Sequence, residues 1–272
     1  MRILITGGNG QLGKALQKVL VGHELTAVDL PEVDITQRAA VQDVLAQTAA
    51  ELVINCAAYT DVDGCARNPE LAYRANGLGP QNLALACLAQ GAALMQISTN
   101  EVFYGDNPHG YDEWMPLNPR NPYGRSKAAG EFHVRSLLPR HYIVRTAWLY
   151  SAGGRNFTQA ILNRAESHGK LRVVADEIGN PTSTADLAQA IAQLVATEQY
   201  GTYHLVNEGA CSRWAFANEI VRLAGFDVPN EPILSREFSR ASSPPPFGAL
   251  HNTAASALGI RLRPWGKRWQ NF

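Results

Sequence analysis

The chain lacks several features that mark particular classes of protein. No uninterrupted apolar run approaches the roughly 20 residues of a membrane helix, and the first residues, MRILITGGNG, enter a strand pattern without a signal-peptide core. We therefore expect no membrane partner and a cytoplasmic location. Lys and Arg number 24 and Asp and Glu also 24, so no excess charge would attract nucleic acid. Any anion that binds must be held by a local site.

Cysteine is scarce, and metal-ligand patterns are missing. Cys56, Cys65, Cys87 and Cys211 form no C-x-x-C pair, so we expect small core residues rather than disulfides. The seven histidines show no H-E-x-x-H spacing, and no metal site is predicted. There is no G-x-S-x-G sequence, so a serine hydrolase is not supported.

Strand-like apolar runs alternate with helical patterns through the first two-thirds of the chain. The predicted strands cover 2–6, 24–29, 51–57, 93–99 and 141–150, and the predicted helices cover 11–20, 36–48, 68–91 and 126–138. Strands separated by helices imply right-handed crossovers and a parallel sheet covered on both faces. The expected fold class is therefore α/β, with a Rossmann-type doubly wound sheet.

The alternation loosens towards the end, where Gly, Pro and Ser become more frequent. Further strands are predicted at 171–176 and 202–206, and further helices at 183–197 and 212–225. We expect residues 1–148 to form the nucleotide-binding domain, with 170–200 returning to it. Residues 149–169 and 201–272 would form a smaller, partly interleaved α/β domain for the substrate.

A glycine-rich loop joins the first predicted strand to the first predicted helix. Gly7, Gly10 and Gly13 form G-x-x-G-x-x-G, with Gln11 and Leu12 between the last two glycines. Glycine permits the tight turn and the close approach of a pyrophosphate, which the helix N-terminus then binds. A glycine triplet alone also fits a plain strand–helix turn, but its place after a strand favours dinucleotide binding.

Asp29 closes the second strand, 22 residues after Gly7. A carboxylate there can accept hydrogen bonds from an adenosine ribose and repel a 2′-phosphate, which modestly favours NADH over NADPH. The alternative is a turn aspartate before Pro31. Use of both cofactors stays open.

Tyr123 and Lys127 lie one helical turn apart in NPYGRSKAAGE and face the same side of a predicted helix. A free phenol, with a pKa near 10, is a poor acid–base catalyst at neutral pH. A nearby ammonium would lower that pKa and make the hydroxyl a usable proton donor. The alternative is a surface pair with no catalytic role.

Taken together, the motifs resemble a known family. The ordered set is TGGNGQLG, INCAAYTDVD, ISTNEVF, YGRSKAAGE, VRTAWLYSAGGRNF, GNPTSTADLA and GTYHLVNEG. It is similar to the extended short-chain dehydrogenase/reductase superfamily, and within it to the dTDP-4-dehydrorhamnose reductases, from residue 1 to about 225.

The resemblance implies reduction of the C4 ketone of a nucleotide-linked 4-keto-6-deoxy sugar by NADH or NADPH. Tyr123 would protonate the C4 oxygen, Lys127 would lower the tyrosine pKa and hold the nicotinamide ribose, and Thr99 would polarise the same oxygen. Trp148 and Asn156 would contact the sugar nucleotide. The remaining cofactor contacts implied are Asp34, Ile35, Ala57, Ala58 and Tyr59.

The sequence departs from the family at one loop. Where the reductases usually read S-T-D-Y-V-F, this chain has Asn100 and Glu101 after Thr99. The related dehydratases have S-T-D-E-V there, but an amide at position 100 cannot deliver the proton that elimination needs. We treat Asn100 and Glu101 as candidate substrate contacts; Glu101 either points into the pocket or is a solvated residue at a strand end.

Other functions stay open on the sequence. A sister reductase or epimerase for another nucleotide sugar would share Tyr123 and Lys127, and the regulatory subunit of methionine adenosyltransferase resembles these reductases without being a catalyst. Family members often form homodimers, which is the only macromolecular partner expected. Arg145 could reach a substrate phosphate or make a structural ion pair, and GNPT at 179–182 would shape the sugar cleft.

Overall fold

A six-stranded parallel sheet forms the centre of the computed structural model, which describes residues 1–154 and 156–266. Its order is β2-β1-β3-β4-β5-β10. The strands are β1 (Arg2–Thr6), β2 (Glu24–Val28), β3 (Leu52–Asn55), β4 (Ala93–Thr99), β5 (His141–Thr146) and β10 (Gly201–His204). The strand order reverses between β1 and β3, where α/β sheets of this kind bind their ligands. The predicted fold class is confirmed.

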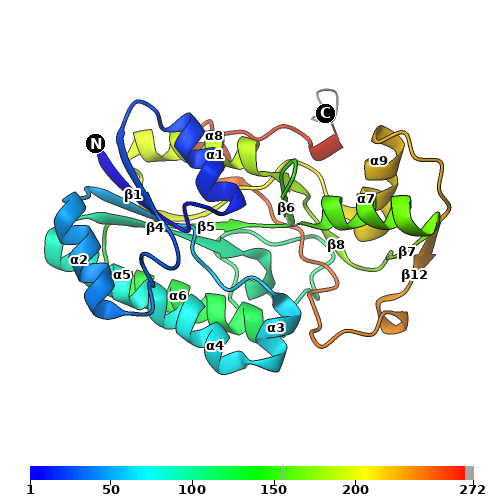
Figure 1. Cartoon of the computed structure of the whole chain (residues 1–272), viewed down its shortest axis with the longest axis horizontal. Helices are drawn as coiled ribbons and strands as arrows, with labels where there is room; N and C mark the ends of the chain where they lie inside the picture. Colours follow the sequence, from blue (N-terminus) through cyan, green and yellow to red (C-terminus); the bar gives the residue numbers. More distant parts are fainter. Residues whose placement is uncertain (155, 267–272) are drawn as a thin grey trace.

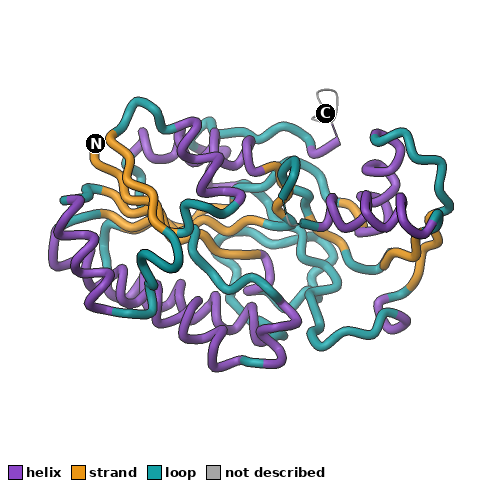
Figure 2. The backbone as a smooth tube through the Cα atoms, in the orientation of Figure 1, coloured by secondary structure: helices purple, strands orange, loops and turns teal. Residues whose placement is uncertain are grey.

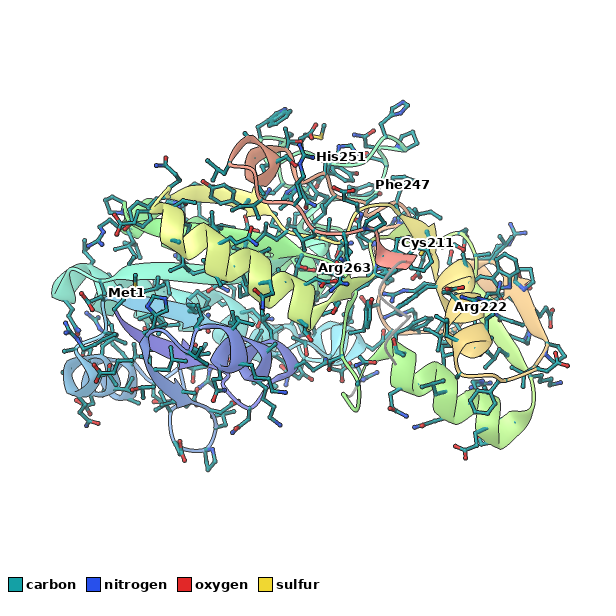
Figure 3. All side chains as sticks on the ribbon, turned by 90° about the horizontal axis from the view of Figure 1, so that it is seen from above. Met1, Cys211, Arg222, Phe247, His251 and Arg263 are labelled. Atoms are coloured by element: carbon teal, nitrogen blue, oxygen red, sulfur yellow. The ribbon has the colours of Figure 1, made fainter. Side chains whose placement is uncertain are left out.

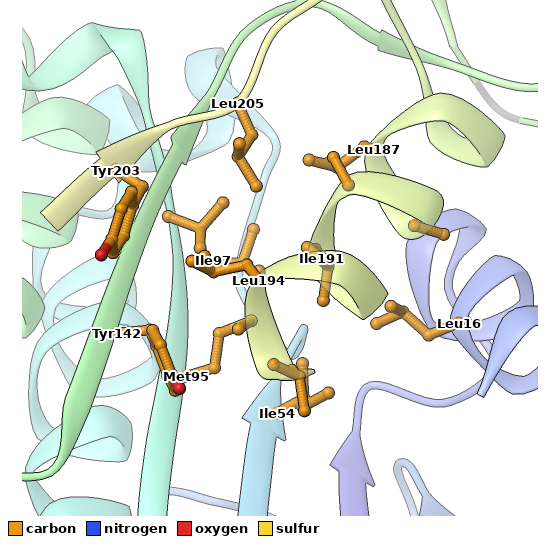
Figure 4. Packing of buried hydrophobic residues seen from close by; sticks show 14 of the residues in the cluster. Leu16, Ile54, Met95, Ile97, Tyr142, Leu187, Ile191, Leu194, Tyr203 and Leu205 are labelled. Carbon is orange, nitrogen blue, oxygen red and sulfur yellow. The ribbon is translucent and has the colours of Figure 1, made fainter. Parts of the chain in front are cut away.

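Helices cover both faces of the sheet, as Figure 1 shows. One layer holds α1 (Gln11–Val19) and α8 (Thr184–Thr197), and the other α2 (Arg38–Thr48), α5 (Gly79–Gln90) and α6 (Pro122–Leu137). In the first layer, Leu16 of α1 and Ile191 of α8 pack on Ile54 and Met95 of the sheet (Figure 4). The strands are apolar on both faces because both faces are buried.

Short helices fill the connections near the cleft described below. After β3 come α3 (Val62–Arg67), α4 (Pro69–Tyr73) and a π-helical turn (Arg74–Leu78) that runs into α5, and one 3₁₀ turn (Asn100–Val102) follows β4. The predicted helix over 68–91 is therefore one nearly continuous helical run.

A smaller unit lies beyond the carboxyl ends of the strands, on the right of Figures 1 and 2. It contains α7 (Phe157–His168), α9 (Arg213–Leu223) and a parallel pair, β7 (Leu171–Val174) with β12 (Asn230–Ile233), around a core that includes Phe216 and Ile220. The remaining elements are β6 (Leu149–Tyr150), β8 (Ile178–Gly179), β9 (Thr182–Ser183), β11 (Cys211–Ser212), a 3₁₀ turn (Ser235–Glu237) and α10 (Thr253–Ala257).

The strand pairing differs from the predicted domain boundaries in two places. β10 pairs with β5 in the central sheet, although 201–272 was assigned to the smaller domain. β7 pairs with β12 in the smaller unit, whereas α8, in the same predicted range 170–200, packs on the central sheet of the larger unit as expected. Short apolar runs look alike in sequence, and only their tertiary partners decide which sheet they join.

The predicted strand over 141–150 is also interrupted. β5 ends at Thr146 and β6 begins at Leu149, and Trp148 between them has a positive φ of 45°. This turn carries the chain from the sheet towards the smaller unit and leaves the Trp148 side chain at their junction.

Candidate active site

A cleft with a volume of about 1730 Å³ runs along the carboxyl ends of the central strands. Thr6 of β1 pairs with Asn55 of β3, and Thr99 of β4 pairs with Thr146 of β5. Because Asn55 pairs with Gln96, β4 and β5 extend about three residues further towards the cleft. The catalytic, cofactor and substrate contacts predicted from the sequence, apart from Arg145 and residues 179–182, all line this one cleft. They are Gly7, Gly10, Gln11, Leu12, Gly13, Asp29, Asp34, Ile35, Ala57, Ala58, Tyr59, Thr99, Asn100, Glu101, Tyr123, Lys127, Trp148 and Asn156.

The glycine loop is shaped by the close approach of backbones. Gly7 has φ +70°, and a Cβ there would lie 2.5 Å from the Ala57 nitrogen. A Cβ at Gly13 would lie 2.8 Å from Gly8 Cα, so α1 packs directly on the loop. Gly10 caps α1 without any side-chain hydrogen bond, so the first N–H groups of the helix are available to a ligand phosphate. The loop fits a dinucleotide pyrophosphate.

Side chains from both units close the cleft around this loop. Gln11 Oε1 accepts hydrogen bonds from Ser151 Oγ and Asn156 Nδ2, both at 2.7 Å. Asn156 also caps α7, where its Oδ1 accepts from the Gln159 N–H. Asn156 therefore holds the start of α7 against the glycine loop, whatever substrate contact it makes.

Asp29 and Asp34 stand at the far end of the cleft. Asp29 Oδ2 accepts from the Asn9 N–H at 2.9 Å and Oδ1 from the Leu30 N–H at 2.8 Å. Asp34 Oδ1 accepts from the Thr36 N–H at 2.9 Å. Asp29 thus binds the backbone of its turn and also borders the cleft. A structural role in the turn and a contact with the cofactor ribose are therefore compatible.

Tyr123 and Lys127 project from the first two turns of α6 into the middle of the cleft. Asn121 caps this helix by accepting a hydrogen bond from the Gly124 N–H at 2.7 Å. The exposed fraction is 9% for Tyr123 and 4% for Lys127, which excludes a surface pair. Lys127 Nζ donates to the Ile97 carbonyl oxygen at 2.6 Å, which ties α6 to β4 near Thr99.

The pKa of Tyr123 differs from the prediction made for it. Burial raises this pKa, and the neighbouring Glu101 carboxylate raises it further, while a hydrogen bond with Thr99 only partly lowers it. Burial also lowers the pKa of Lys127, to about 8. The net shift of the Tyr123 pKa is therefore upward, opposite to the direction expected from Lys127 alone, because desolvation disfavours the charged forms of both groups. The phenol is neutral at physiological pH, which is the state that a proton donor needs.

The two unusual residues after Thr99 have different surroundings. Asn100 Nδ2 donates to the Gly248 carbonyl at 3.0 Å, and Asn100 Oδ1 accepts from Thr99 Oγ1 at 3.3 Å. Glu101 lines the cleft and its Oε2 accepts from Asn121 Nδ2 at 2.6 Å. Burial raises the pKa of Glu101. Glu101 thus borders the pocket beside Tyr123 and is not a solvated strand end.

Arg213 is a cleft residue that the sequence patterns missed. It begins α9, and its guanidinium carbon lies 3.7 Å from the centre of the Trp148 ring. Gly179 lies beneath the same ring, because a Cβ there would be 2.6 Å from Trp148 Cε2. No motif marks Arg213, since it meets Trp148 only through the fold.

Arg145 is a structural residue. Its guanidinium donates to Glu131 at 2.8–3.2 Å and to the Glu113 carbonyl at 3.1 Å. Among the described residues all four cysteines are free, and no group of three or more His, Cys, Asp and Glu could hold a metal. In the same part of the chain, no helix has the length and apolarity needed to cross a bilayer.

The doubly wound sheet, the glycine loop at its switch point and the buried tyrosine–lysine pair define an NAD(P)-dependent oxidoreductase of the extended short-chain dehydrogenase/reductase superfamily. A family model described as the RmlD substrate binding domain matches residues 1–272. The chain belongs to that family.

Known proteins similar to the chain include several reductases. A dTDP-4-dehydrorhamnose reductase of Streptomyces griseus is 41% identical, over 97% of this chain and 90% of that protein. The structure of a Bacillus anthracis dTDP-4-dehydrorhamnose reductase in complex with NADP superimposes with a TM-score of 0.96 at 39% identity, over 100% of this chain and 98% of that one. A probable dTDP-4,6-dihydroxy-2-methyloxan-3-one 4-ketoreductase of Streptomyces antibioticus is 35% identical, over 97% of this chain and 92% of that protein.

Proposed function

We propose that this enzyme reduces the C4 ketone of dTDP-4-dehydro-L-rhamnose to give dTDP-L-rhamnose, using NADH or NADPH. The observation that carries the proposal is the buried group of Thr99, Tyr123 and Lys127 in the cleft. The similarity to dTDP-4-dehydrorhamnose reductases over almost the whole chain supports the choice of sugar.

We infer a role for each residue, supported by its position in the cleft. A bound reduced nicotinamide supplies the hydride that is added at the ketone carbon. Tyr123 Oη donates its proton to the ketone oxygen, and Thr99, which hydrogen-bonds Tyr123, orients the same oxygen. Lys127, held by the Ile97 carbonyl, stabilises the phenolate left behind until it regains a proton. The glycine loop and the N-terminus of α1 would hold the pyrophosphate of the cofactor.

The proposal is tested by adding NADH or NADPH and dTDP-4-dehydro-L-rhamnose made in place by the upstream enzymes. Oxidation of the cofactor with formation of dTDP-L-rhamnose is expected. Cofactor binding without oxidation would contradict the proposal and favour either a different 4-keto sugar or a non-catalytic subunit. Sedimentation of the same sample would test the homodimer that family resemblance implies.

A second sugar is kept as a candidate because of Asn100 and Glu101. A carboxylate beside Tyr123 changes what the pocket can hydrogen-bond, and one relative is described as a 4-ketoreductase for a different dTDP sugar. A panel of dTDP- and UDP-linked 4-keto sugars separates the two candidates, by the value of kcat/KM for each.

We also propose a modest preference for NADH, on the basis of the Asp29 carboxylate at the cleft. Asp29→Asn removes the charge and keeps an oxygen that can accept from the Asn9 N–H. We expect the ratio of kcat/KM for NADPH to that for NADH to rise by about tenfold, as loss of one unfavourable charge contact allows. An unchanged ratio would contradict the assignment of Asp29 to the ribose.

A further inference from the structure

Arg213 is a charged residue of the cleft to which the proposed chemistry gives no role. Its side chain is 22% exposed, and it lines the cleft together with Glu101 and Trp148. The guanidinium stacks on Trp148 at 3.7 Å and lies 5.0 Å from the centre of the Phe157 ring. Two aromatic rings therefore fix its position on the side of the smaller unit.

The hydrogen bonding of this guanidinium is incomplete. Arg213 Nε lies 3.9 Å from Glu177 Oε2, which is longer than a hydrogen bond, and no hydrogen bond from the guanidinium to any described residue is found. Arg145, the other arginine buried in this region, donates to Glu131, Glu113 and His204. A guanidinium has five N–H donors. Those of Arg213 open onto the cleft, where a ligand can supply acceptors in place of solvent.

The surrounding charges leave Arg213 able to attract an anion. Glu177 also faces Arg240 at 4.0 Å, and Arg240 in turn pairs with Asp63 at 3.2 Å. Glu177 and Glu101 both attract the Arg213 charge, and burial raises the pKa of each carboxyl, so each takes up a proton more readily than an exposed glutamate does. Burial lowers the pKa of Arg213 to about 10, so it stays charged at neutral pH.

Two other cations that line the cleft are engaged at short range, whereas Lys14, Lys18 and Arg74 also line it and make no side-chain hydrogen bond to a described residue. Arg263 donates to Asp186 Oδ1 at 2.7 Å, and Lys127 donates to the Ile97 carbonyl at 2.6 Å. Arg213 differs from both because its nearest carboxylate is 3.9 Å away.

We propose that Arg213 binds the diphosphate of the nucleotide-sugar substrate, with Trp148 as the platform that orients its guanidinium plane. The inference rests on the proposed function for the identity of the ligand. A planar guanidinium presents parallel N–H groups that match two phosphate oxygens, and stacking fixes this plane before the ligand arrives. Arg213 is thus a residue for substrate affinity, distinct from the proton donor.

The test compares dTDP with thymidine in calorimetric binding to the wild type, Arg213→Gln, Arg213→Lys and Arg222→Gln. Arg222 lies on the same helix, exposed and paired with Glu219, and serves as the matched control (Figure 3). In Arg213→Gln we expect the Kd of dTDP to rise by roughly 30-fold, as for loss of a buried charged contact. The Kd of thymidine should change less than about twofold, because it has no phosphate.

Arg213→Lys keeps the positive charge but lacks the planar guanidinium with its parallel N–H donors, so it should raise the Kd of dTDP less than Arg213→Gln does. NADPH binding, measured on the same samples, should match the wild type and shows that the variants are folded. Equal weakening of dTDP and thymidine would overturn the proposal, since Arg213 would then only support Trp148. An unchanged Kd for dTDP, or no dTDP binding by the wild type, would also overturn it.

This experiment does not depend on turnover. If the enzyme reduces no 4-keto sugar but Arg213→Gln selectively weakens dTDP, the proposed function fails while the role of Arg213 stands. If the enzyme is active and Arg213→Gln leaves the ratio of the Kd of dTDP to the Kd of thymidine unchanged, the proposed function stands and the role of Arg213 fails.

Discussion

Tyr123 and Lys127 are both buried, and burial decides their protonation. The pKa of the phenol is raised and that of the ammonium lowered to about 8. Each group is thereby pushed towards its neutral form. A neutral phenol carries the proton that reduction of a ketone needs. Because the raised pKa makes Tyr123 a weaker acid, transfer of that proton depends on the Lys127 charge to stabilise the phenolate that is left.

Replacement of Tyr123 by Phe should remove turnover and leave cofactor binding nearly intact. The variant loses only the hydroxyl, and general acid catalysis contributes about 10²–10⁴-fold to a rate. We expect kcat to fall by that amount, with the Kd of NADPH changed less than about twofold since the ring still fills its site. Fluorescence titration and initial rates measure the two effects. Full activity in Tyr123→Phe would show that another group protonates the sugar.

Lys127 should make stability depend on pH in a defined direction. Its pKa is about 8 in the folded protein, below the ordinary value of 10.5. Between these values the unfolded chain holds a proton that the folded chain lacks, so stability contributed by Lys127 rises as pH increases from 8 to 10.5 and is constant below 8.

The comparison is urea unfolding of the wild type and Lys127→Met at pH 8 and pH 10. The wild type should gain about 2 kcal/mol relative to the variant over this interval, since one pH unit corresponds to at most about 1.4 kcal/mol. Lys18→Met, at an exposed lysine of α1, is the control for loss of a lysine in general. A stability difference that is constant with pH would mean that Lys127 is not desolvated.

At the scale of elements, the glycine loop couples β1 to α1 by backbone contact. A Cβ at Gly13 would lie within 2.8 Å of Gly8 Cα and 2.9 Å of its carbonyl carbon, and neither backbone atom can move independently. Such crowding forces the start of α1 away from the strand end. The pyrophosphate site would then lose its shape.

Gly13→Ala should therefore weaken NADPH binding by at least about tenfold and lower stability by about 1–3 kcal/mol, as overpacking does. Gly22→Ala is the matched control, because no atom lies within 4 Å of the added Cβ and the φ there is not positive. Titration with NADPH and thermal unfolding measure both effects. Equal behaviour of the two variants would contradict the packing described for the loop.

Elements and site were predictable from the sequence to different extents. The strand at 93–99 and the glycine loop follow from local periodicity and spacing, and the Tyr123–Lys127 pair from one helical turn. The pKa direction of Tyr123 was not, because burial is a tertiary property. The stacking of Arg213 on Trp148 was not predictable either, since these residues are 65 positions apart in the sequence and no motif links them. β10 was misplaced because an apolar run does not specify its neighbouring strand.

At the scale of the whole molecule, the chain passes between the two units more than once. It leaves the sheet after β5, forms α7 and β7, returns for α8 and β10, and leaves again for α9 and β12 (Figures 1 and 2). The last strand of the sheet is thus added only after part of the smaller unit. Neither unit is a continuous segment that could unfold alone.

We therefore expect a single unfolding transition that NADPH shifts as a whole. At a free concentration 100 times its Kd, NADPH should stabilise the protein by about 2.7 kcal/mol. Calorimetry with and without NADPH tests this. Two transitions, of which only one moves with NADPH, would show that the units unfold independently.

The most direct test of the proposed chemistry follows one hydrogen atom. The enzyme is supplied with nicotinamide cofactor deuterated at the transferred position, and the product made from dTDP-4-dehydro-L-rhamnose in ordinary water is examined by NMR. We predict dTDP-L-rhamnose with deuterium at C4 and none elsewhere, and no labelled product from Tyr123→Phe. A product without deuterium at C4, or labelled product formed by Tyr123→Phe at the wild-type rate, would contradict a Tyr123-dependent ketone reduction.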